Sequence, residues 1–492
     1  MNLCCIGHTF QYEMEKLCRI FLPFEKIQIS YELIKSSSMA VTEICGNDIY
    51  ASVLMNEKFA ENKANLITGF SERDAERELA ALLFKCFSEI TAYSPKWGIV
   101  TGIRPARLYS SVAKELGGEN EAKEFFKEKF FVSDEKITLC EETHLGEAKI
   151  IELSESDSFS LYISIPFCPS RCSYCSFVSH AVEKAEHLIP EYVKYLCKEI
   201  KETSVIAKKN KLKLKTIYVG GGTPTTLDDN QLRIVLNAVN ECFDLSHLLE
   251  FTVEAGRPDT ITEEKLNTLK ACGVSRISIN PQTMNDEVLR TIGRAHTTKQ
   301  TVDAFNLARK VGFDNINMDL IAGLPGDDFE SFKKTVEQLL TLDPESITVH
   351  SLSMKRSSRM NISGDFPEIE AGKVADDMVT YARKILTQNE ILPYYMYRQS
   401  KTVGNLENVG YAKIGTECLY NVFIMDETHT ILACGASAVT KLREPNGDYI
   451  ERIFNFKYPY EYINRFDELM LRKKGIDDFY EKYNKTGEKI DV

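Results

Sequence analysis

The sequence lacks several features that would point to a membrane protein or a nucleic-acid-binding protein. It has no run of about 18 uncharged apolar residues, the length that a membrane-spanning helix needs. Its first residues lack the basic region followed by an apolar stretch that marks an export signal. Positive charge is not in excess, because 60 Lys and Arg face 72 Asp and Glu, a net charge of −12 that suits phosphate backbones poorly. We therefore expect a cytoplasmic protein without a membrane span and without a nucleic-acid partner.

Tryptophan is also scarce, and the single Trp97 lies beside the turn-forming Gly98. A lone tryptophan at such a place is more often a packing residue than a ligand contact. The overall composition, with 43% apolar and 27% charged residues, is typical of a folded globular protein and excludes a disordered or collagen-like chain. The length of 492 residues suggests roughly three domains.

The middle of the chain alternates short β-branched runs with longer helical stretches. Such βα units in series predict a parallel sheet that is closed or partly closed into a barrel. We predict an α/β protein with an N-terminal α/β domain over residues 1–155, a partial (β/α)6 barrel over 156–370 and a C-terminal α+β cap domain over 371–492. The six predicted strands are 161–165, 216–219, 251–254, 276–279, 316–321 and 347–350.

Three of the 14 cysteines form a close group, Cys168, Cys172 and Cys175, in a loop directly after the first predicted strand. Chance would produce this C-x3-C-x2-C spacing about 0.01 times in such a chain. Three thiolates in one loop can hold three irons of a four-iron cluster and leave the fourth iron open. The amine and carboxylate of S-adenosylmethionine could chelate that iron. The alternative is a structural zinc site completed by His180, and the other eleven cysteines are expected to be packing residues.

Polar or glycine residues follow the next strands at the points where these strands end. The second strand runs into Gly220, Gly221, Gly222 and Thr223, and a glycine run lets backbone groups approach a ligand closely. The following strands contribute Glu254, Gln282 and Asp319, and Arg294 lies in the segment between Gln282 and Asp319. Because barrel sites lie where strands end, we expect these residues to surround one ligand site.

These motifs resemble the radical S-adenosylmethionine superfamily and, within it, the oxygen-independent coproporphyrinogen III oxidase family in its HemZ-like branch. The resemblance implies that Cys168, Cys172 and Cys175 bind a 4Fe-4S cluster, with Tyr174 beside it. It implies that one S-adenosylmethionine contacts Tyr162, Gly221, Gly222, Thr223 and Glu254. A second molecule would contact Gln282, Arg294 and Asp319. A fourth cysteine of the best-studied type is replaced here by Phe177.

The resemblance also implies a reaction and its partners. A 5′-deoxyadenosyl radical would drive the oxidative decarboxylation of coproporphyrinogen III to protoporphyrinogen IX in haem biosynthesis, with a low-potential electron donor. Other members of the family are haem-binding chaperones or haem-modifying enzymes, which is the alternative function. Candidate partners for the substrate carboxylates are Arg257, Arg294, Lys355, Arg356, Arg359 and Arg398.

Overall fold

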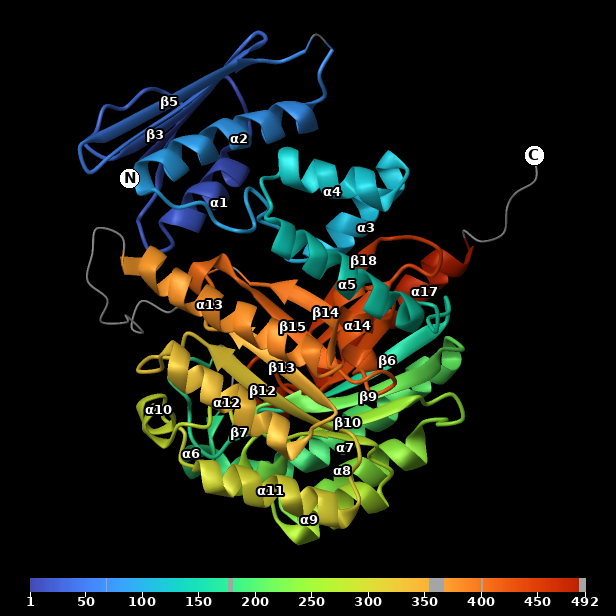
Figure 1. Cartoon of the computed structure of the whole chain (residues 1–492). Helices are drawn as coiled ribbons and strands as arrows, with labels where there is room; N and C mark the ends of the chain where they lie inside the picture. Colours follow the sequence, from blue (N-terminus) through green and yellow to red (C-terminus); the bar gives the residue numbers. More distant parts are fainter. Residues whose placement is uncertain (68, 176–179, 354–366, 400, 486–492) are drawn as a thin grey trace. The chain divides into compact units, whose positions relative to one another are not determined.

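The computed structural model describes residues 1–67, 69–175, 180–353, 367–399 and 401–485. The predicted Phe177, Lys355, Arg356 and Arg359 lie outside the described residues. The chain divides into two compact units (Figure 1). Unit 1 contains residues 1–144, 351–381 and 396–408, and unit 2 contains residues 145–350, 382–395 and 409–492. No helix of the described residues is both long and apolar enough to cross a membrane.

Unit 1 begins with a five-stranded sheet whose strand order is β2-β1-β3-β4-β5. The helices α1 (Gln11–Phe21) and α2 (Glu72–Thr91) lie on one side of it (Figure 1). Ser71 starts α2 with a capping box that it forms with Asp74, and this satisfies two free backbone donors. Apolar side chains of both helices and of the sheet form one core. The strands are β1 (Asn2–Ile6), β2 (Gln28–Ser30), β3 (Met39–Cys45), β4 (Asp48–Met55) and β5 (Lys58–Asn65).

A buried ion pair joins distant segments of unit 1. Lys136 lies on α5 (Asp134–Ile151), which follows α3 (Pro105–Leu116) and α4 (Glu119–Glu128). Its Nζ is 2.7 Å from Glu407 Oε1, and the two side chains are 2% and 3% exposed. Trp97 Nε1 donates to the other oxygen of Glu407 at 2.7 Å. Trp97 is 1% exposed, as expected for a packing residue.

Unit 2 carries the predicted series of βα units. Its sheet has the strand order β14-β15-β13-β12-β11-β10-β9-β6-β16-β17-β18. Neighbours from β6 to β12 pair in parallel, which confirms the α/β fold with a partial (β/α)6 barrel. The six strands are β6 (Ser158–Ile165), β9 (Lys213–Gly221), β10 (Glu250–Glu254), β11 (Arg276–Ser278), β12 (Ile316–Ala322) and β13 (Ser346–Ser351).

Helices follow these strands and cover the outer side of the sheet (Figure 1). Each long helix buries an apolar stripe, as an amphipathic helix on a sheet must. The helices are α7 (Ile189–Lys209), α8 (Asp229–Cys242), α9 (Glu263–Ala271), α10 (Asp286–Thr291), α11 (Thr298–Val311) and α12 (Phe329–Leu342). Helix α13 (Pro367–Gln388) follows later in the chain, and most of it belongs to unit 1. Because the strands are parallel, their carboxyl ends meet at one edge.

The C-terminal part of the chain extends the sheet beyond both ends of the parallel series. Strand β16 (Thr430–Cys434) pairs in parallel with β6, and β15 (Glu407–Ala412) pairs antiparallel with β13. Lys473 on α16 (Phe466–Lys473) forms a 2.8 Å ion pair with Glu199 on α7, and both side chains are at most 1% exposed. The remaining elements are β14 (Leu392–Arg398), α14 (Leu419–Asp426), β17 (Val439–Arg443), β18 (Ile450–Phe454), α15 (Pro459–Asn464) and α17 (Gly475–Lys485).

Candidate functional site

The cysteine loop begins where β6 ends. After β6 the chain forms the short strand β7 (Phe167–Cys168), which pairs with β8 (His180–Ala181). The loop is attached to the segment after α10, because the Ser173 N–H donates to the Ile292 carbonyl at 3.1 Å and the Ser170 hydroxyl donates to the Gly293 carbonyl at 3.2 Å. Cys172 is buried, and Cys168 and Cys175 are partly exposed. The predicted three cysteines thus lie on one tethered loop at the carboxyl edge of the sheet.

Two of the cysteine sulfurs accept hydrogen bonds from neighbouring βα units. The Thr223 hydroxyl donates to Cys168 Sγ at 3.5 Å, and Arg257 Nη1 donates to Cys172 Sγ at 3.9 Å. Hydrogen bonds to a sulfur stabilise its thiolate form, the form in which cysteine binds iron. The chemistry around these sulfurs therefore suits a metal cluster.

The glycine run after β9 packs closely against the start of the cysteine loop. The Gly222 N–H donates to the Ile165 carbonyl at 2.8 Å, and the Thr223 N–H donates to the Phe167 carbonyl at 2.7 Å. A Cβ on Gly222 would lie 2.5 Å from the Phe167 carbonyl oxygen, closer than a side chain allows. Gly222 is thus required for the contact between two strand ends, in addition to the cofactor contact that the resemblance implies.

Glu254 lies at the end of β10 beside a stack of aromatic rings. The Tyr218 hydroxyl donates to Glu254 Oε1 at 2.6 Å. The Tyr218 ring stacks on Tyr420 at a centroid distance of 4.5 Å, and the Tyr162 ring stacks 6.3 Å from Tyr218. Burial, the largest influence, raises the pKa of the Glu254 carboxyl to about 7, and the negative charge of Asp319 acts in the same direction. A cationic partner would stabilise the ionised form of this buried carboxyl group.

The strand register explains why these rings meet. Tyr162 on β6 pairs with Tyr218 on β9, so both side chains point to the same face of the sheet. Tyr420 comes from α14, and the carboxylate of Glu250 on β10 fixes the start of that helix by accepting from the Leu419 N–H at 2.7 Å. A carboxylate at a helix N-terminus is favourable because the helix dipole is positive there.

Gln282, in the segment after β11, lies beside Asp319 in the middle of β12. The Gln282 N–H donates to the Asp319 carbonyl at 2.9 Å, and the Gln282 backbone has a left-handed φ of 69°. The Gln282 side-chain oxygen is buried without a hydrogen-bond partner. Burial opposes ionisation of Asp319, but His350 and Asn317 outweigh it and hold the pKa of Asp319 below its ordinary value. An unpaired buried amide oxygen and a negative carboxylate together suit a ligand with N–H donors or positive charge.

Arg294 and Tyr174 contact each other. Arg294 donates to the Tyr174 hydroxyl from Nε at 3.1 Å and from Nη2 at 2.9 Å. Its Nη1 donates to the carbonyls of Gly256 and Asn280. His296, two residues further on, is 2% exposed, and burial lowers the pKa of its imidazole to about 4. The predicted Arg294 and Tyr174 therefore meet beside the cysteine loop.

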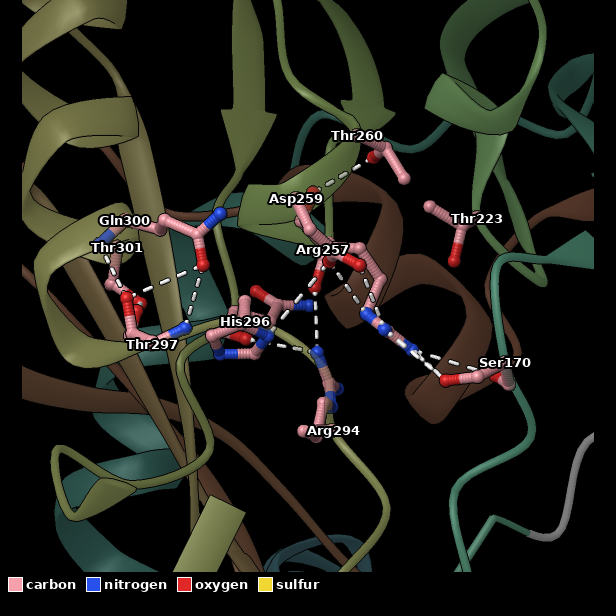
Figure 2. A network of polar contacts seen from close by, with 12 residues as sticks. Ser170, Thr223, Arg257, Asp259, Thr260, Arg294, His296, Thr297, Gln300 and Thr301 are labelled. Carbon is pink, nitrogen blue, oxygen red and sulfur yellow. Dashed lines mark hydrogen bonds and ion pairs between the residues drawn. The ribbon is translucent and has the colours of Figure 1, made fainter. Parts of the chain in front are cut away.

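Two predicted substrate arginines are buried and already hydrogen-bonded. Arg257 binds Asp259 and Ser170 (Figure 2). Arg398, in unit 1, donates to the carbonyls of Val100 and Asn405 and lies over the Trp97 ring. These contacts favour structural roles for both arginines over a contact with substrate.

Comparison with known proteins shows the family. The family model "Radical SAM superfamily" matches residues 162–339. The Bacillus subtilis oxygen-independent coproporphyrinogen-III oxidase-like protein HemZ is 38% identical over 399 residues, which cover 80% of this chain and 80% of HemZ. The chain belongs to the HemZ-like family of radical SAM proteins.

Two further similarities are weaker or shorter than the similarity to HemZ. The heme chaperone HemW of Bacillus subtilis is 41% identical over 194 residues, which cover 39% of this chain and 50% of HemW. The solved coproporphyrinogen III oxidase HemN from Escherichia coli is 22% identical, has a TM-score of 0.49, and the match covers 66% of this chain and 73% of HemN.

Radical SAM proteins generally hold a 4Fe-4S cluster and S-adenosylmethionine, and the donors at the cysteine sulfurs fit such a cluster. Within the described residues, no group of three or more His, Cys, Asp and Glu side chains is placed to hold a single metal ion. A cluster differs from a single ion because each thiolate binds a different iron. The zinc site with His180 remains the alternative prediction for this loop.

Sequence reasoning about this HemZ-like chain missed Tyr218 and Asp259. Tyr218 was detectable, because it lies two residues before Gly220 and so shares a strand face with it. Asp259 had no signal in the sequence, since its role depends on the position of Arg257 relative to the cysteine loop.

Proposed function

We propose that this protein is an oxygen-independent coproporphyrinogen III oxidase, which converts coproporphyrinogen III to protoporphyrinogen IX by oxidative decarboxylation of two propionate groups. The observation that carries this proposal is the similarity to the oxidase-like HemZ over 80% of both chains. The three-cysteine loop and the carboxylates at the strand ends support a radical SAM reaction at the edge of the barrel.

The proposed site assigns the cluster to Cys168, Cys172 and Cys175. When bound, the reduced cluster and S-adenosylmethionine supply a radical that removes a hydrogen atom from substrate. Thr223 and Arg257 would donate hydrogen bonds to the ligand sulfurs of Cys168 and Cys172. An external low-potential donor would supply the electron.

The proposed contacts with S-adenosylmethionine follow the charges at the strand ends. Glu254 would accept a hydrogen bond from the amino group of the first molecule, and Tyr218 would hold the Glu254 carboxylate in place. Tyr162, Gly221, Gly222 and Thr223 would complete that contact. The unpaired Gln282 oxygen, with Asp319 and Arg294, would receive the second molecule.

Anaerobic turnover tests the proposal. Purified protein is loaded with iron and sulfide, then given reductant, S-adenosylmethionine and coproporphyrinogen III, and 5′-deoxyadenosine and protoporphyrinogen IX are quantified. We expect both products. Cleavage of S-adenosylmethionine without decarboxylation, together with haem binding, would instead support the chaperone function named for HemW.

A cysteine variant tests the cluster ligands. Cys172→Ala is expected to abolish cluster retention and both products, because one iron loses its ligand. Cys45→Ala is the matched control, since Cys45 is exposed on the first sheet, and it should leave iron content and turnover unchanged. Full activity of Cys172→Ala would contradict the assigned ligands.

A further inference from the structure

We propose that Arg257 is a positioning residue that fixes the cysteine loop and raises the reduction potential of the cluster through its hydrogen bond to Cys172. This inference rests on the cluster assignment of the proposed function. The sequence suggested that Arg257 contacts a substrate carboxylate, and this inference replaces that role.

The guanidinium group of Arg257 is held in one orientation. Nε donates to Asp259 Oδ1 and Nη2 donates to Asp259 Oδ2, both at 3.0 Å (Figure 2). This bidentate pair uses one edge of the planar fork and fixes the direction of the other N–H groups. Arg257 is 3% exposed, so water does not compete strongly for these donors.

The opposite edge of the guanidinium faces the cysteine loop. Nη1 donates to the Ser170 hydroxyl at 3.2 Å and to Cys172 Sγ at 3.9 Å, and Nη2 reaches the Ser170 hydroxyl at 3.3 Å. Ser170 in turn donates to the Gly293 carbonyl. Arg257 therefore links the segment after β10 to the cysteine loop, and Cys172 precedes Arg257 by 85 residues in the chain.

The backbone that carries Arg257 and Asp259 is also fixed. Both residues flank Pro258, which starts a short 3-10 helix, Pro258–Thr260. The Thr260 hydroxyl donates to the Arg257 carbonyl at 2.8 Å, and the Lys265 ammonium donates to the Thr260 carbonyl at 3.1 Å. The guanidinium consequently has little freedom to turn away from the loop.

A fixed positive N–H donor at a ligand sulfur changes the energies of the two cluster states unequally. Reduction adds a negative charge to the cluster, so the donor stabilises the reduced state more than the oxidised state. Weak solvent screening at a buried site strengthens this difference. Asp259 opposes it in part, but the guanidinium lies between Asp259 and Cys172, so the positive charge is the nearer one.

The test compares Arg257→Met and Arg257→Lys with a matched control. Arg233→Met removes an arginine of the same unit, on α8, whose guanidinium binds Thr268 on α9. Each variant is loaded anaerobically, the iron per chain is measured, and the midpoint potential is determined by a redox titration followed by electron paramagnetic resonance. Neither measurement depends on turnover.

We expect the ratio of reduced to oxidised cluster at a fixed solution potential to fall about tenfold in Arg257→Met, which corresponds to about 59 mV for one electron. Arg257→Lys keeps the charge but loses the fork and should show a smaller fall. Arg233→Met should match the unaltered protein. If Arg257→Met retains no cluster while Arg257→Lys does, the positioning role is supported and the potential is measured on the lysine variant.

Separate outcomes distinguish this inference from the proposed function. An unchanged midpoint potential in fully loaded Arg257 variants would overturn the inference while the cluster assignment stands. A raised KM for coproporphyrinogen III at unchanged potential would show that Arg257 is a substrate contact instead. Failure of the unaltered protein to take up any cluster would overturn both proposals.

Discussion

Protonation of Glu254 should make the binding of S-adenosylmethionine depend on pH. The pKa of this carboxyl is raised to about 7, mainly by burial. At pH 8 about nine tenths of the groups are ionised, and at pH 6 about one tenth. If only the ionised Glu254 carboxylate accepts a hydrogen bond from the amino group of the ligand, the Kd should be about tenfold higher at pH 6 than at pH 8.

The sign of this effect gives a second observable. An N–H donor of the bound ligand stabilises the Glu254 carboxylate, so binding lowers the pKa of Glu254 and releases a proton, about half a proton per site near pH 7. Without ligand, the raised pKa acts on stability in the opposite sense: the folded state holds a proton that the unfolded state has lost. The ligand-free protein should therefore lose stability as the pH rises from 4.5 toward 7.

Calorimetry on cluster-loaded protein measures the Kd and the number of protons released on binding, if it is run in two buffers with different ionisation enthalpies. The amino group of the free ligand also titrates near pH 8, and it does so with either protein. Glu254→Gln is therefore the reference, because the difference between the two pH profiles comes from Glu254 alone. Tyr218→Phe removes a hydrogen bond that lowers the Glu254 pKa, so its pH midpoint should move upward. Identical pH profiles of the unaltered protein and Glu254→Gln would refute the role of Glu254.

Two further predictions concern the fold around the site and in unit 1. Lys136→Met leaves Glu407 charged and buried, and should lower the free energy of unfolding of unit 1 by about 3–5 kcal/mol in chemical denaturation. Adding Glu407→Leu should restore most of this loss. An unaltered denaturation midpoint in Lys136→Met would contradict the pairing. Although burial acts against it, Lys136 holds the pKa of Glu407 below 4.5, so this contribution should be present above pH 4.5 and disappear as the pH falls through the lower folded pKa. Gly222→Ala forces the end of β9 away from the Phe167 carbonyl and should weaken binding of S-adenosylmethionine at least tenfold. In the control Gly102→Ala the added Cβ would meet open space, so binding should be normal. Equal Kd values of the two variants by calorimetry would show that the strand ends tolerate the shift.

Local pattern was enough to predict the barrel and the residues at its strand ends. The β-branched runs match β6, β9, β10, β11, β12 and β13 because strand alternation and helix periodicity are properties of short segments. The cysteine loop and the glycine run were also readable, since each motif lies within ten residues. The C-terminal tail forms three short helices, α15, α16 and α17, with breaks at Arg465 and Lys474.

Other features depend on contacts between residues that are far apart in the chain. Arg257 and Cys172 are separated by 85 residues, and Lys136 and Glu407 by 271. The alternating βα units, and the cysteines, glycines and carboxylates near their ends, follow from local patterns of residues. The contacts of Arg257 with the Cys172 sulfur, of Tyr218 with Glu254 and of Lys136 with Glu407 do not, because burial and charge pairing depend on which distant side chains the folded chain brings together.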